Sequence, residues 1–460
     1  MKNNKSDILT AILTTTTVLV FMLMLYFVKL GSISNKYPLY TGIFIVLMLF
    51  IITSAYLKQK NHFTKKGRKK TNHKQKYNII LLAVWIITGL FMLYSDIIVF
   101  KKYWLFSLIL LLLFTPLFMI FKRFSTDYRD KLWHWYTAGI EIAFVIAAVM
   151  CFLFRPQMEG YRYCGLTINP NVFARFLLSV WICLLFRINE NVHKVADMKK
   201  YIRIGIEGGM VLFFMYATGS RTSFLAVAVI SFIWFIVLVY YSRKNNKIFL
   251  RHLILAIAIS IPSFAMSHIA LNTIPDIVNR PITYENDKLF VSNNDNCTIC
   301  YAAGTDHIDN TIPSSAQAGV SAIDRITSIF DDNTTLDTIL NGRLEIYKHY
   351  IEDIDYEGHI KYSKKFNHKR VPHAHNSWIQ VAYTYGLLAG IAYTLLTILA
   401  FIYSIRYLIK FNNKRSTAVL PLLIVIAFGI TSLTECLILP IQSLLAFSFY
   451  FTVGELINSK

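Results

Sequence analysis

Charged residues are scarce in this chain, since Asp, Glu, Lys and Arg make up only 16 % of it against 55 % for hydrophobic residues. A soluble domain carries about 25 % charged residues, so the composition excludes a soluble globular protein. The hydrophobic residues fall in windows long enough to cross a bilayer as helices, with polar breaks between them. The sequence therefore predicts an all-α, polytopic integral membrane protein in a lipid bilayer.

Twelve apolar windows predict about 12 transmembrane helices, at residues 8–30, 39–57, 79–94, 103–121, 135–154, 172–185, 204–217, 223–241, 253–271, 378–403, 418–434 and 437–453. The first window follows only two lysines and has no small-residue cleavage site, which predicts a first span and not a removed signal peptide. Residues 1–271 then hold helices 1–9, residues 272–376 form a loop domain, and residues 377–460 hold helices 10–12.

Acidic residues are absent from loop 58–76, which carries nine lysines and arginines. Because basic loops resist translocation, this loop and both chain termini are predicted on the cytoplasmic face, with residues 272–376 outside. Every second connection has a similar excess of basic residues. The net charge of +21 therefore reports membrane topology, and no nucleic-acid partner is expected.

The external segment 272–376 differs from the other connections, because it is long and holds more than half of the 26 acidic residues. Long loops without helix or strand are usually functional, so we expect a substrate-binding lid here. Arg343 lies on an apolar helical stripe and has two interpretations, a salt-bridged arginine at the interface or an anion-binding arginine. Periodicity over residues 336–354 builds that stripe from Leu336, Ile339, Leu340, Tyr347, Tyr350, Ile351 and Ile354.

Cysteine is rare, and among the six cysteines only Cys297 and Cys300 form a C-x-x-C pair. A structural zinc site needs a second pair of ligands, so zinc is disfavoured. Two interpretations of the pair stay open, a local disulfide or two free thiols.

The turn T-G-S-R-T at residues 218–222 joins two spans with almost no loop. Arg221 opens a helix there, where its charge opposes both the helix dipole and the topology rule. Gly219 and Ser220 leave room for a bulky anion beside the free amides of the helix start. The turn predicts a phosphate-binding site, and the alternative is a stray interfacial arginine.

Two further stretches carry polar groups at the outer face. His373 and His375 lie where the long loop meets a span, and a histidine there can take a proton near neutral pH. Asn376 or Ser377 can cap the helix that follows. Upstream, Arg155 and Arg162 precede the turn 165–171, in which Asn171 has two open roles, a helix cap or a ligand.

These stretches together resemble a known family. The motifs are G-x-x-x-N-P-N at 165–171, T-G-S-R-T, N-G-R-x-x-x-Y at 341–347, H-N at 375–376 and Y-G-L-L-A-G at 385–390. Their order and predicted external placement resemble the O-antigen ligase and O-antigen polymerase superfamily of bacterial membrane glycosyltransferases, over about residues 155–390. The extra His373 and the long acidic, Asn-rich insertion depart from the shorter ligases.

The resemblance implies a GT-C-like fold in the bacterial cytoplasmic (inner) membrane, with the active site facing outside. It implies transfer of a glycan from an undecaprenyl-diphosphate carrier to an acceptor glycan or glycolipid, in polysaccharide or lipopolysaccharide biosynthesis of the cell envelope. No metal and no other cofactor is implied. Metal-dependent GT-C enzymes carry carboxylates in the first external loop, and here residues 31–38 contain no Asp or Glu.

By position, the resemblance makes His375, Arg221 and Arg343 the catalytic residues of an inverting displacement. His375 is expected to take the proton of the acceptor hydroxyl while the two arginines neutralise the departing diphosphate. A set of neighbouring residues is expected to bind substrate: Arg162, Arg155, Asn171, Ser220, Asn376 and His373.

Two questions stay open at this stage. A polymerase and a ligase share this chemistry and differ in the acceptor, and the long, aromatic external segment favours a polymerase. A lipid-linked oligosaccharide flippase or transporter is the second class, since Glu141, Arg203, Glu207 and Glu435 fall in or beside spans. We see no internal repeat, and Arg221, Arg343 and His375 are expected at one surface. An enzyme is therefore favoured, with the three glutamates as hydrogen-bond partners between helices.

Overall fold

The computed structural model describes residues 78–100, 107, 111, 114–115, 118–119, 126–156, 158–159, 162–167, 169–192, 198–241, 246–278, 343–359, 364–366, 369–371, 373–412, 414–438 and 443–459. Several predictions lie outside the described residues. They concern spans 8–30 and 39–57, basic loop 58–76, most of span 103–121, most of the external segment, and the pair Cys297 and Cys300.

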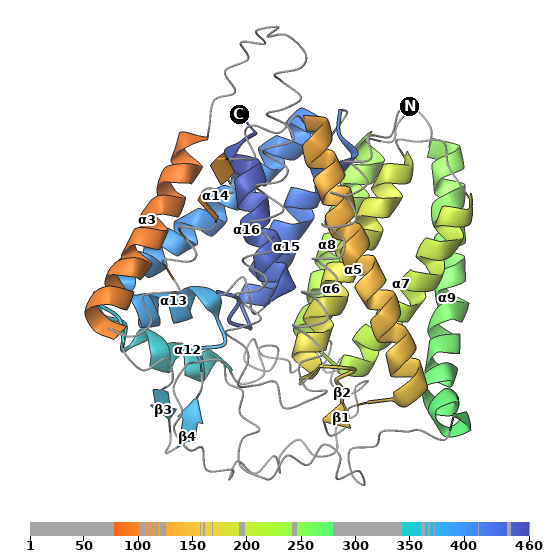
Figure 1. Ribbon diagram of the computed structural model, residues 1–460, viewed down its shortest axis with the longest axis horizontal. Helices are drawn as coiled ribbons and strands as arrows, with labels where there is room; N and C mark the ends of the chain where they lie inside the picture. Colours follow the sequence, from red (N-terminus) through yellow and green to blue (C-terminus); the bar gives the residue numbers. More distant parts are fainter. Residues whose placement is uncertain are drawn as a thin grey trace, which may run out of the picture.

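Helices dominate the described chain and lie beside one another as a bundle (Figure 1). Six of the described helices are long and apolar enough to cross a membrane, so a polytopic membrane protein is confirmed while the number of twelve stays a prediction. These six are α3 (Ile79–Ser95), α5 (Thr126–Phe154), α6 (Pro170–Val192), α8 (Arg221–Tyr241), α9 (Asn246–Ile277) and α14 (Leu387–Phe411).

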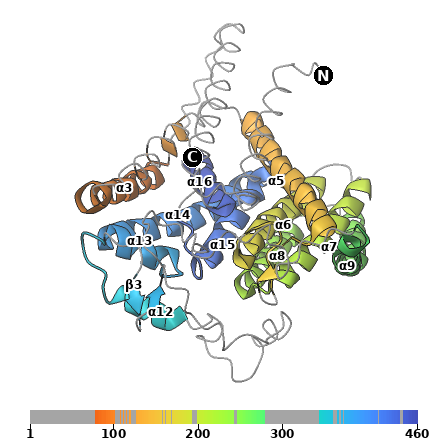
Figure 2. The same ribbon diagram turned by 60° about the horizontal axis from the view of Figure 1, so that its bottom comes forward.

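The remaining elements are shorter or more polar. In the bundle these are η3 (Asp96–Phe100), which continues α3, and α7 (Met198–Thr218), η4 (Ser416–Val419), α15 (Leu420–Ser432) and α16 (Leu444–Ile457). Outside it lie α12 (Arg343–Ile351), α13 (Ser377–Tyr385) and two antiparallel hairpins, β1 (Met158–Glu159) with β2 (Arg162–Tyr163) and β3 (Lys364–Phe366) with β4 (Lys369–Val371). Within the described residues the fold is thus helical apart from these two hairpins, which lie with α12 and α13 at one end of the bundle (Figures 1 and 2).

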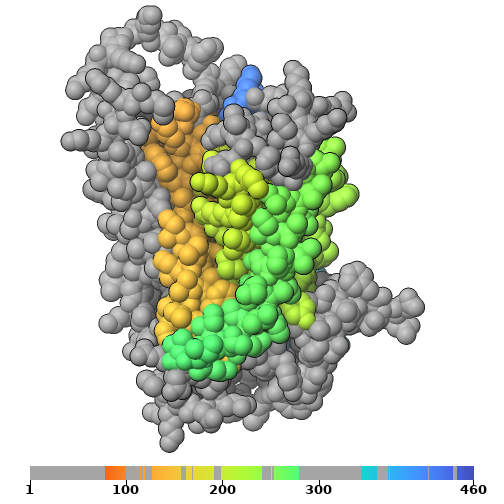
Figure 3. Space-filling view, turned by 90° about the vertical axis from the view of Figure 1, so that its right-hand side faces the viewer, coloured from red at the N-terminus to blue at the C-terminus, as the bar shows by residue number. Residues whose placement is uncertain are grey.

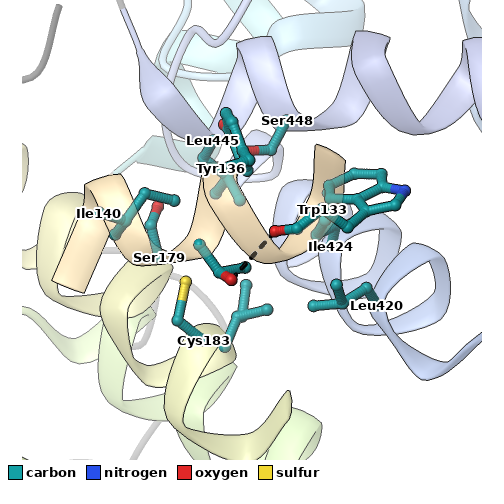
Figure 4. A pocket seen from close by; sticks show the side chains of 11 residues that line it. Trp133, Tyr136, Ile140, Ser179, Cys183, Leu420, Ile424, Leu445 and Ser448 are labelled. Carbon is teal, nitrogen blue, oxygen red and sulfur yellow. Dashed lines mark hydrogen bonds between the residues drawn. The ribbon is translucent and has the colours of Figure 1, made fainter. Parts of the chain in front are cut away.

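The centre of the bundle is apolar and aromatic. Every residue of α16 is buried, as expected for a helix that is apolar on all sides. Around it, Trp85 of α3 packs edge-on against Tyr450 with ring centroids 5.5 Å apart. A small cavity lies among α5, α6, α15 and α16 (Figure 4), where the Tyr136 hydroxyl and the Ser448 hydroxyl are 2.5 Å apart. None of the predicted site residues lines this cavity.

Helix α9 packs across the outside of α7 and α5 (Figure 3). Glycine allows the close approach to α7, because a Cβ at Gly209 would lie 2.4 Å from the Ser260 carbonyl oxygen. The Ser260 hydroxyl in turn donates to the Gly205 carbonyl at 3.1 Å. The other side of α9 exposes large apolar residues, among them Ile261 and Met266, as a lipid-facing helix does.

Two of the buried glutamates occupy the interior of the bundle. Glu141 of α5 accepts from Arg187 of α6 at 2.7 Å and from Arg203 of α7 at 3.0 Å, which confirms it as a partner between helices. Glu207 instead pairs with Arg203 of its own helix at 2.6 Å. The bond observed for Glu207 thus lies within α7, and Arg203 connects it to Glu141 of α5.

The predicted span 378–403 is wrong as a single helix, because the chain breaks at Gly386 into α13 and α14. Gly386 has φ +88°, and a Cβ there would lie 2.2 Å from the Tyr356 carbonyl oxygen. Gly358, with φ +91°, approaches the Thr384 carbonyl equally closely from the other side. The Ser95 hydroxyl donates to the Tyr385 carbonyl at 2.7 Å, so the break is held by α3 as well. The sequence stays apolar through the break, so a prediction from hydropathy does not reveal it.

Two other predicted elements differ at their ends. The span 437–453 becomes a helix only from Leu444, and residues 433–438 form an irregular segment that leads from α15 toward α13. The described part of the predicted helix 336–354 is α12, whose Tyr347 and Tyr350 are buried while Ile351 is 52 % exposed. Placing Ile351 on the buried stripe is wrong, because it lies about 100° around the helix from Tyr350 and α12 packs along a narrow face.

Candidate active site

The turn between α7 and α8 has the geometry that its sequence predicts. Gly219 takes φ +57°, and α8 begins at Arg221. Ser220 precedes the helix, accepts the Phe224 amide at 3.1 Å and keeps its hydroxyl 3.2 Å from that of Ser223. Arg221 is half-buried at the helix start. The turn thus places Arg221 at the amino end of α8.

Arg162 joins this turn to the start of α6. Its Nε donates to the Thr218 carbonyl at 2.8 Å, and its Nη2 donates to Asn171 Oδ1 at 2.6 Å. Asn169 is the cap of α6, because its Oδ1 accepts the Asn171 amide at 2.8 Å and its carbonyl accepts the Val172 amide at 3.0 Å. The cap role that had stayed open for Asn171 is therefore wrong, and its side chain points to Arg162 instead.

Glu435 lies at the centre of the candidate site. The sequence had predicted only a hydrogen-bond partner between helices for it. Its Oε1 accepts from Asn171 Nδ2 at 3.2 Å and lies 3.4 Å from Arg343 Nη2. Burial acts to raise the pKa of this carboxyl, but the guanidinium groups of Arg175 and Arg343 outweigh burial and lower it. Glu435 is therefore an ionised group between arginines from α6 and α12.

Arg343 opens α12 and reaches the irregular segment 433–438. Its Nη1 donates to the Thr434 carbonyl, and its Nη2 pairs with Glu435. The Thr434 hydroxyl in turn donates to Thr222 of the α7–α8 turn at 2.9 Å. Of the two interpretations of Arg343, the salt bridge is observed, and the segment 433–438 connects it to the helix that begins at Arg221.

His375 lies beside this segment with an uncommon backbone. Its φ is +52°, its amide donates to His373 Nδ1 at 3.3 Å, and the two rings are 4.0 Å apart. The Tyr347 hydroxyl lies 3.3 Å from the His375 carbonyl. The Nδ1 atom of His375 is buried without a hydrogen-bond partner in the described part of the chain. Burial, with a smaller contribution from His373, lowers the pKa of His375 to about 3, so the ring is neutral at neutral pH.

The next two residues fix α13 on the site. Asn376 is the cap of α13, since its Oδ1 accepts the amides of Trp378 at 3.0 Å and Ile379 at 3.1 Å. The Ser377 hydroxyl donates to the Glu435 carbonyl at 2.9 Å and accepts the Leu437 amide at 2.8 Å. The predicted choice between Asn376 and Ser377 as the cap is thereby decided for Asn376. Ser377 ties α13 to the segment that carries Glu435.

Arg155 is the predicted site residue that the structure does not bring to this cluster. Its guanidinium donates to the carbonyls of Leu271 and Asn272, both at 2.9 Å, and pairs with Asp276 at 3.4 Å. These groups belong to the carboxyl end of α9, where a cation complements the helix dipole. Arg155 thus caps α9.

The structure defines a class of protein: a polytopic helical membrane protein with a histidine, several arginines and one glutamate gathered at one end of its bundle. The family model described as O-antigen ligase matches residues 209–394. This match confirms the resemblance to the O-antigen ligase and polymerase superfamily that the motifs suggested, and it supports an enzyme of that general type in a bacterial membrane. No curated protein matches the chain.

The matched range contains Arg221, Arg343 and His375 but neither Arg162 nor Glu435. No single stretch of sequence marks Glu435 as a site residue. One signal was present, because an isolated acidic residue between two apolar windows needs a cationic partner.

Proposed function

We propose that the protein is an inverting glycosyltransferase that moves a glycan from an undecaprenyl-diphosphate carrier to an acceptor sugar at the outer face of the cytoplasmic membrane. One observation carries the proposal. Arg162, Arg343, His375 and the α7–α8 turn come from four separate segments and meet at one end of the bundle, around Glu435. A histidine base beside several guanidinium groups suits transfer from a diphosphate.

In the proposed reaction, the acceptor hydroxyl oxygen attacks the anomeric carbon on the face opposite the diphosphate. The bond between that carbon and the diphosphate oxygen breaks, and its electron pair leaves with the carrier. His375 takes the hydroxyl proton, and Arg221 and Arg343 neutralise the departing charge without the need for a metal. The bound diphosphate would also raise the pKa of His375 through its negative charge, which strengthens the base when substrate is present.

The arginines support this function more than transport across the bilayer. A transporter is expected to keep its decisive charges near the middle of the membrane. Arg343 instead contacts Thr434 and Glu435, which follow α15, and Arg162 contacts the end of α7. The Tyr347 hydroxyl lies between the carbonyls of Leu433 and His375. We accordingly propose a GT-C-like arrangement with about 12 spans, cytoplasmic termini and an external loop domain at residues 272–376.

The acceptor separates two candidate functions. We favour a polymerase, because the segment before α13 holds Tyr356, whose side chain is exposed and offers aromatic surface for a sugar chain. A ligase that transfers to a lipid A core is the second candidate, favoured by the description of the matching family.

The test gives purified protein only an undecaprenyl-diphosphate-linked repeat unit and separates the products by size. A ladder of multiples supports the polymerase. No product until a core-type acceptor is added would replace it with the ligase. No glycan transfer under either condition would contradict both. His268→Ala is the matched control for His375→Ala, since His268 is an exposed histidine of α9 outside the proposed site.

A further inference from the structure

The catalytic base proposed above has a backbone conformation that side-chain-bearing residues rarely adopt. His375 has φ +52°, in the left-handed region, where its Cβ crowds the following carbonyl. Only contacts from the surroundings keep a histidine there. The orientation of the imidazole, and hence its reach to an acceptor hydroxyl, depends on those contacts.

Both sides of the His375 peptide are held by side chains. On the carbonyl side, the Tyr347 hydroxyl of α12 donates to the Leu433 carbonyl and lies 3.3 Å from the His375 carbonyl oxygen. On the amide side, the nitrogen donates to Nδ1 of His373 at 3.3 Å. Between the two histidines, the buried Ala374 donates its amide to Gln380 Oε1 of α13 at 2.6 Å, which fixes the loop from within.

The contact at His373 requires one state of that ring. An Nδ1 that accepts a hydrogen bond carries a lone pair, so His373 must be neutral with its proton on Nε2. Burial lowers the pKa of His373 and so favours the neutral ring. The charged or titratable groups that face it are Glu435 of segment 433–438, Arg343 of α12, Arg175 of α6 and His375 itself.

We propose that His373 is a positioning residue, whose Nδ1 holds the His375 backbone in the left-handed conformation and so aims the base. The proposal rests on the function proposed above, with His375 as the base. It gives the extra histidine of the H-A-H-N sequence a role that does not require contact with substrate.

Three substitutions at one position test the proposal. His373→Ala removes the acceptor. His373→Asn keeps one, because Asn Oδ1 sits at the same distance from the backbone as His Nδ1. His373→Gln moves the acceptor one bond further out. We expect His373→Ala and His373→Gln to lower kcat by about 10- to 100-fold, as a misplaced base does, and His373→Asn to restore most of it.

The KM for the carrier-linked donor is expected to stay within about 2-fold in all three variants, since the arginines that hold the diphosphate are intact. Melting temperatures in detergent should remain close to that of the unchanged protein. A purely structural role would instead lower the melting temperature and kcat together, and Asn would not rescue. Where the alanine variant gives no monodisperse protein, the comparison of Asn with Gln decides alone.

The outcomes separate the two proposals. Unchanged kcat in His373→Ala, or Asn no better than Gln, overturns the positioning role while the transfer reaction stands. Equal rates for the unchanged protein and His375→Ala overturn the proposed base, and with it the positioning role. Both proposals are supported if His375→Ala abolishes transfer, His373→Gln lowers kcat and His373→Asn keeps most of it.

Discussion

At the scale of single residues, the site is held by one carboxylate between cations. Glu435 pairs with Arg343 and accepts from Asn171, and its pKa is lowered because Arg175 and Arg343 outweigh the effect of burial. Removing one member of such a group leaves the others buried without compensation. The arginines are therefore expected to depend on Glu435 for their positions.

Glu435→Ala should destabilise the end of the bundle that holds the proposed site and misplace Arg343. We expect a loss of about 2–3 kcal/mol of unfolding free energy, the scale for an uncompensated partly buried charge, together with reduced transfer. Thermal unfolding in detergent and turnover of the carrier-linked substrate measure the two effects. Glu435→Asp is the control, since it keeps the charge. A stable and fully active alanine variant would show that Glu435 has no part in the site.

His375→Ala should abolish transfer while donor binding persists, because the base acts on the acceptor. Arg221→Ala and Arg343→Ala should also weaken donor binding, and each of the three changes should add at least ~2–3 kcal/mol to the barrier. Arg221→Lys should rescue poorly, since an ammonium lacks the planar fork of a guanidinium. Turnover and donor binding are measured side by side. Full turnover in His375→Ala, with loss in His373→Ala, would assign the base to the other histidine.

The acid limb of the pH profile should lie far below the ordinary titration of histidine. Burial lowers the pKa of His375 from 6.5 to about 3, so the free enzyme keeps a neutral base as the pH falls from 7 to 5. We therefore expect kcat/KM, which reports the free enzyme, to fall only below about pH 5. An acid limb near pH 6.5 that disappears in His373→Asn would assign the limb to His373 instead.

The same lowered pKa predicts how stability varies with pH. Between pH 6.5 and 3 the unfolded chain binds a proton at His375 that the folded chain does not. The contribution of His375 to the free energy of unfolding is therefore fully present above about pH 6.5 and is lost as the pH falls toward 3. Melting temperature against pH checks this, and His375→Ala should show a flatter dependence over the same range.

At the scale of elements, the break between α13 and α14 decides where His375 lies. A single straight helix over residues 378–403 would carry the histidine away from Tyr347 and Glu435. The break is maintained by two glycines, Gly358 and Gly386, which approach the carbonyls of Thr384 and Tyr356. Backbone contacts at this corner, and not hydropathy, therefore set the position of the proposed base.

Gly386→Ala should be strongly destabilising. The new Cβ would meet the Tyr356 carbonyl oxygen at 2.2 Å, and the residue would have to keep φ +88°. We expect a loss of at least ~2–3 kcal/mol and reduced activity. Gly429→Ala in α15 is the matched control, because open space surrounds its Cβ position, and Ala favours a helix over Gly by about 1 kcal/mol. Equal melting temperatures for the two variants would contradict the role of the corner.

At the scale of the whole molecule, the two ends of the bundle carry different ionic groups. One end holds the proposed site. The other holds a buried network in which Glu455 pairs with Arg129 at 3.3 Å and with Arg415 at 2.8 Å, while Arg415 also contacts Asp130. The network joins α5 and α16 to the chain just after α14, next to the carboxyl end of the chain (Figure 1). We predict this end on the cytoplasmic side.

Accessibility labelling tests the orientation. A cysteine at Asn310 should react with a membrane-impermeant maleimide added to intact cells, whereas one at Lys66 should react only after the membrane is opened. Variants are made in a background without the native cysteines and first checked for expression. Labelling of position 310 only from the cytoplasmic side would reverse the topology and remove the proposed external reaction.

Local signals in the sequence were enough for several features. The apolar windows identify the spans that became α3, α5, α6, α8 and α9, because hydropathy depends on neighbouring residues alone. The turn at Gly219 and the start of α8 at Arg221 also follow from local residue types. The motifs around Arg221, Arg343 and His375 suggested a resemblance to the superfamily, and the family match over residues 209–394 supports that resemblance.

Tertiary contacts decided the rest. Glu435 meets Asn171 across 264 residues of chain and Arg343 across 92, so no pattern of nearby residues could pair them. Arg155 and Arg162 are both arginines that precede the turn 165–171, and the sequence does not distinguish them. Arg155 nevertheless caps α9, because the fold brings the carboxyl end of that helix to it. The sequence by itself determined which segments enter the membrane; the packing of helices distant along the chain determined which polar side chains share a site, since that depends on distances that hydropathy does not encode.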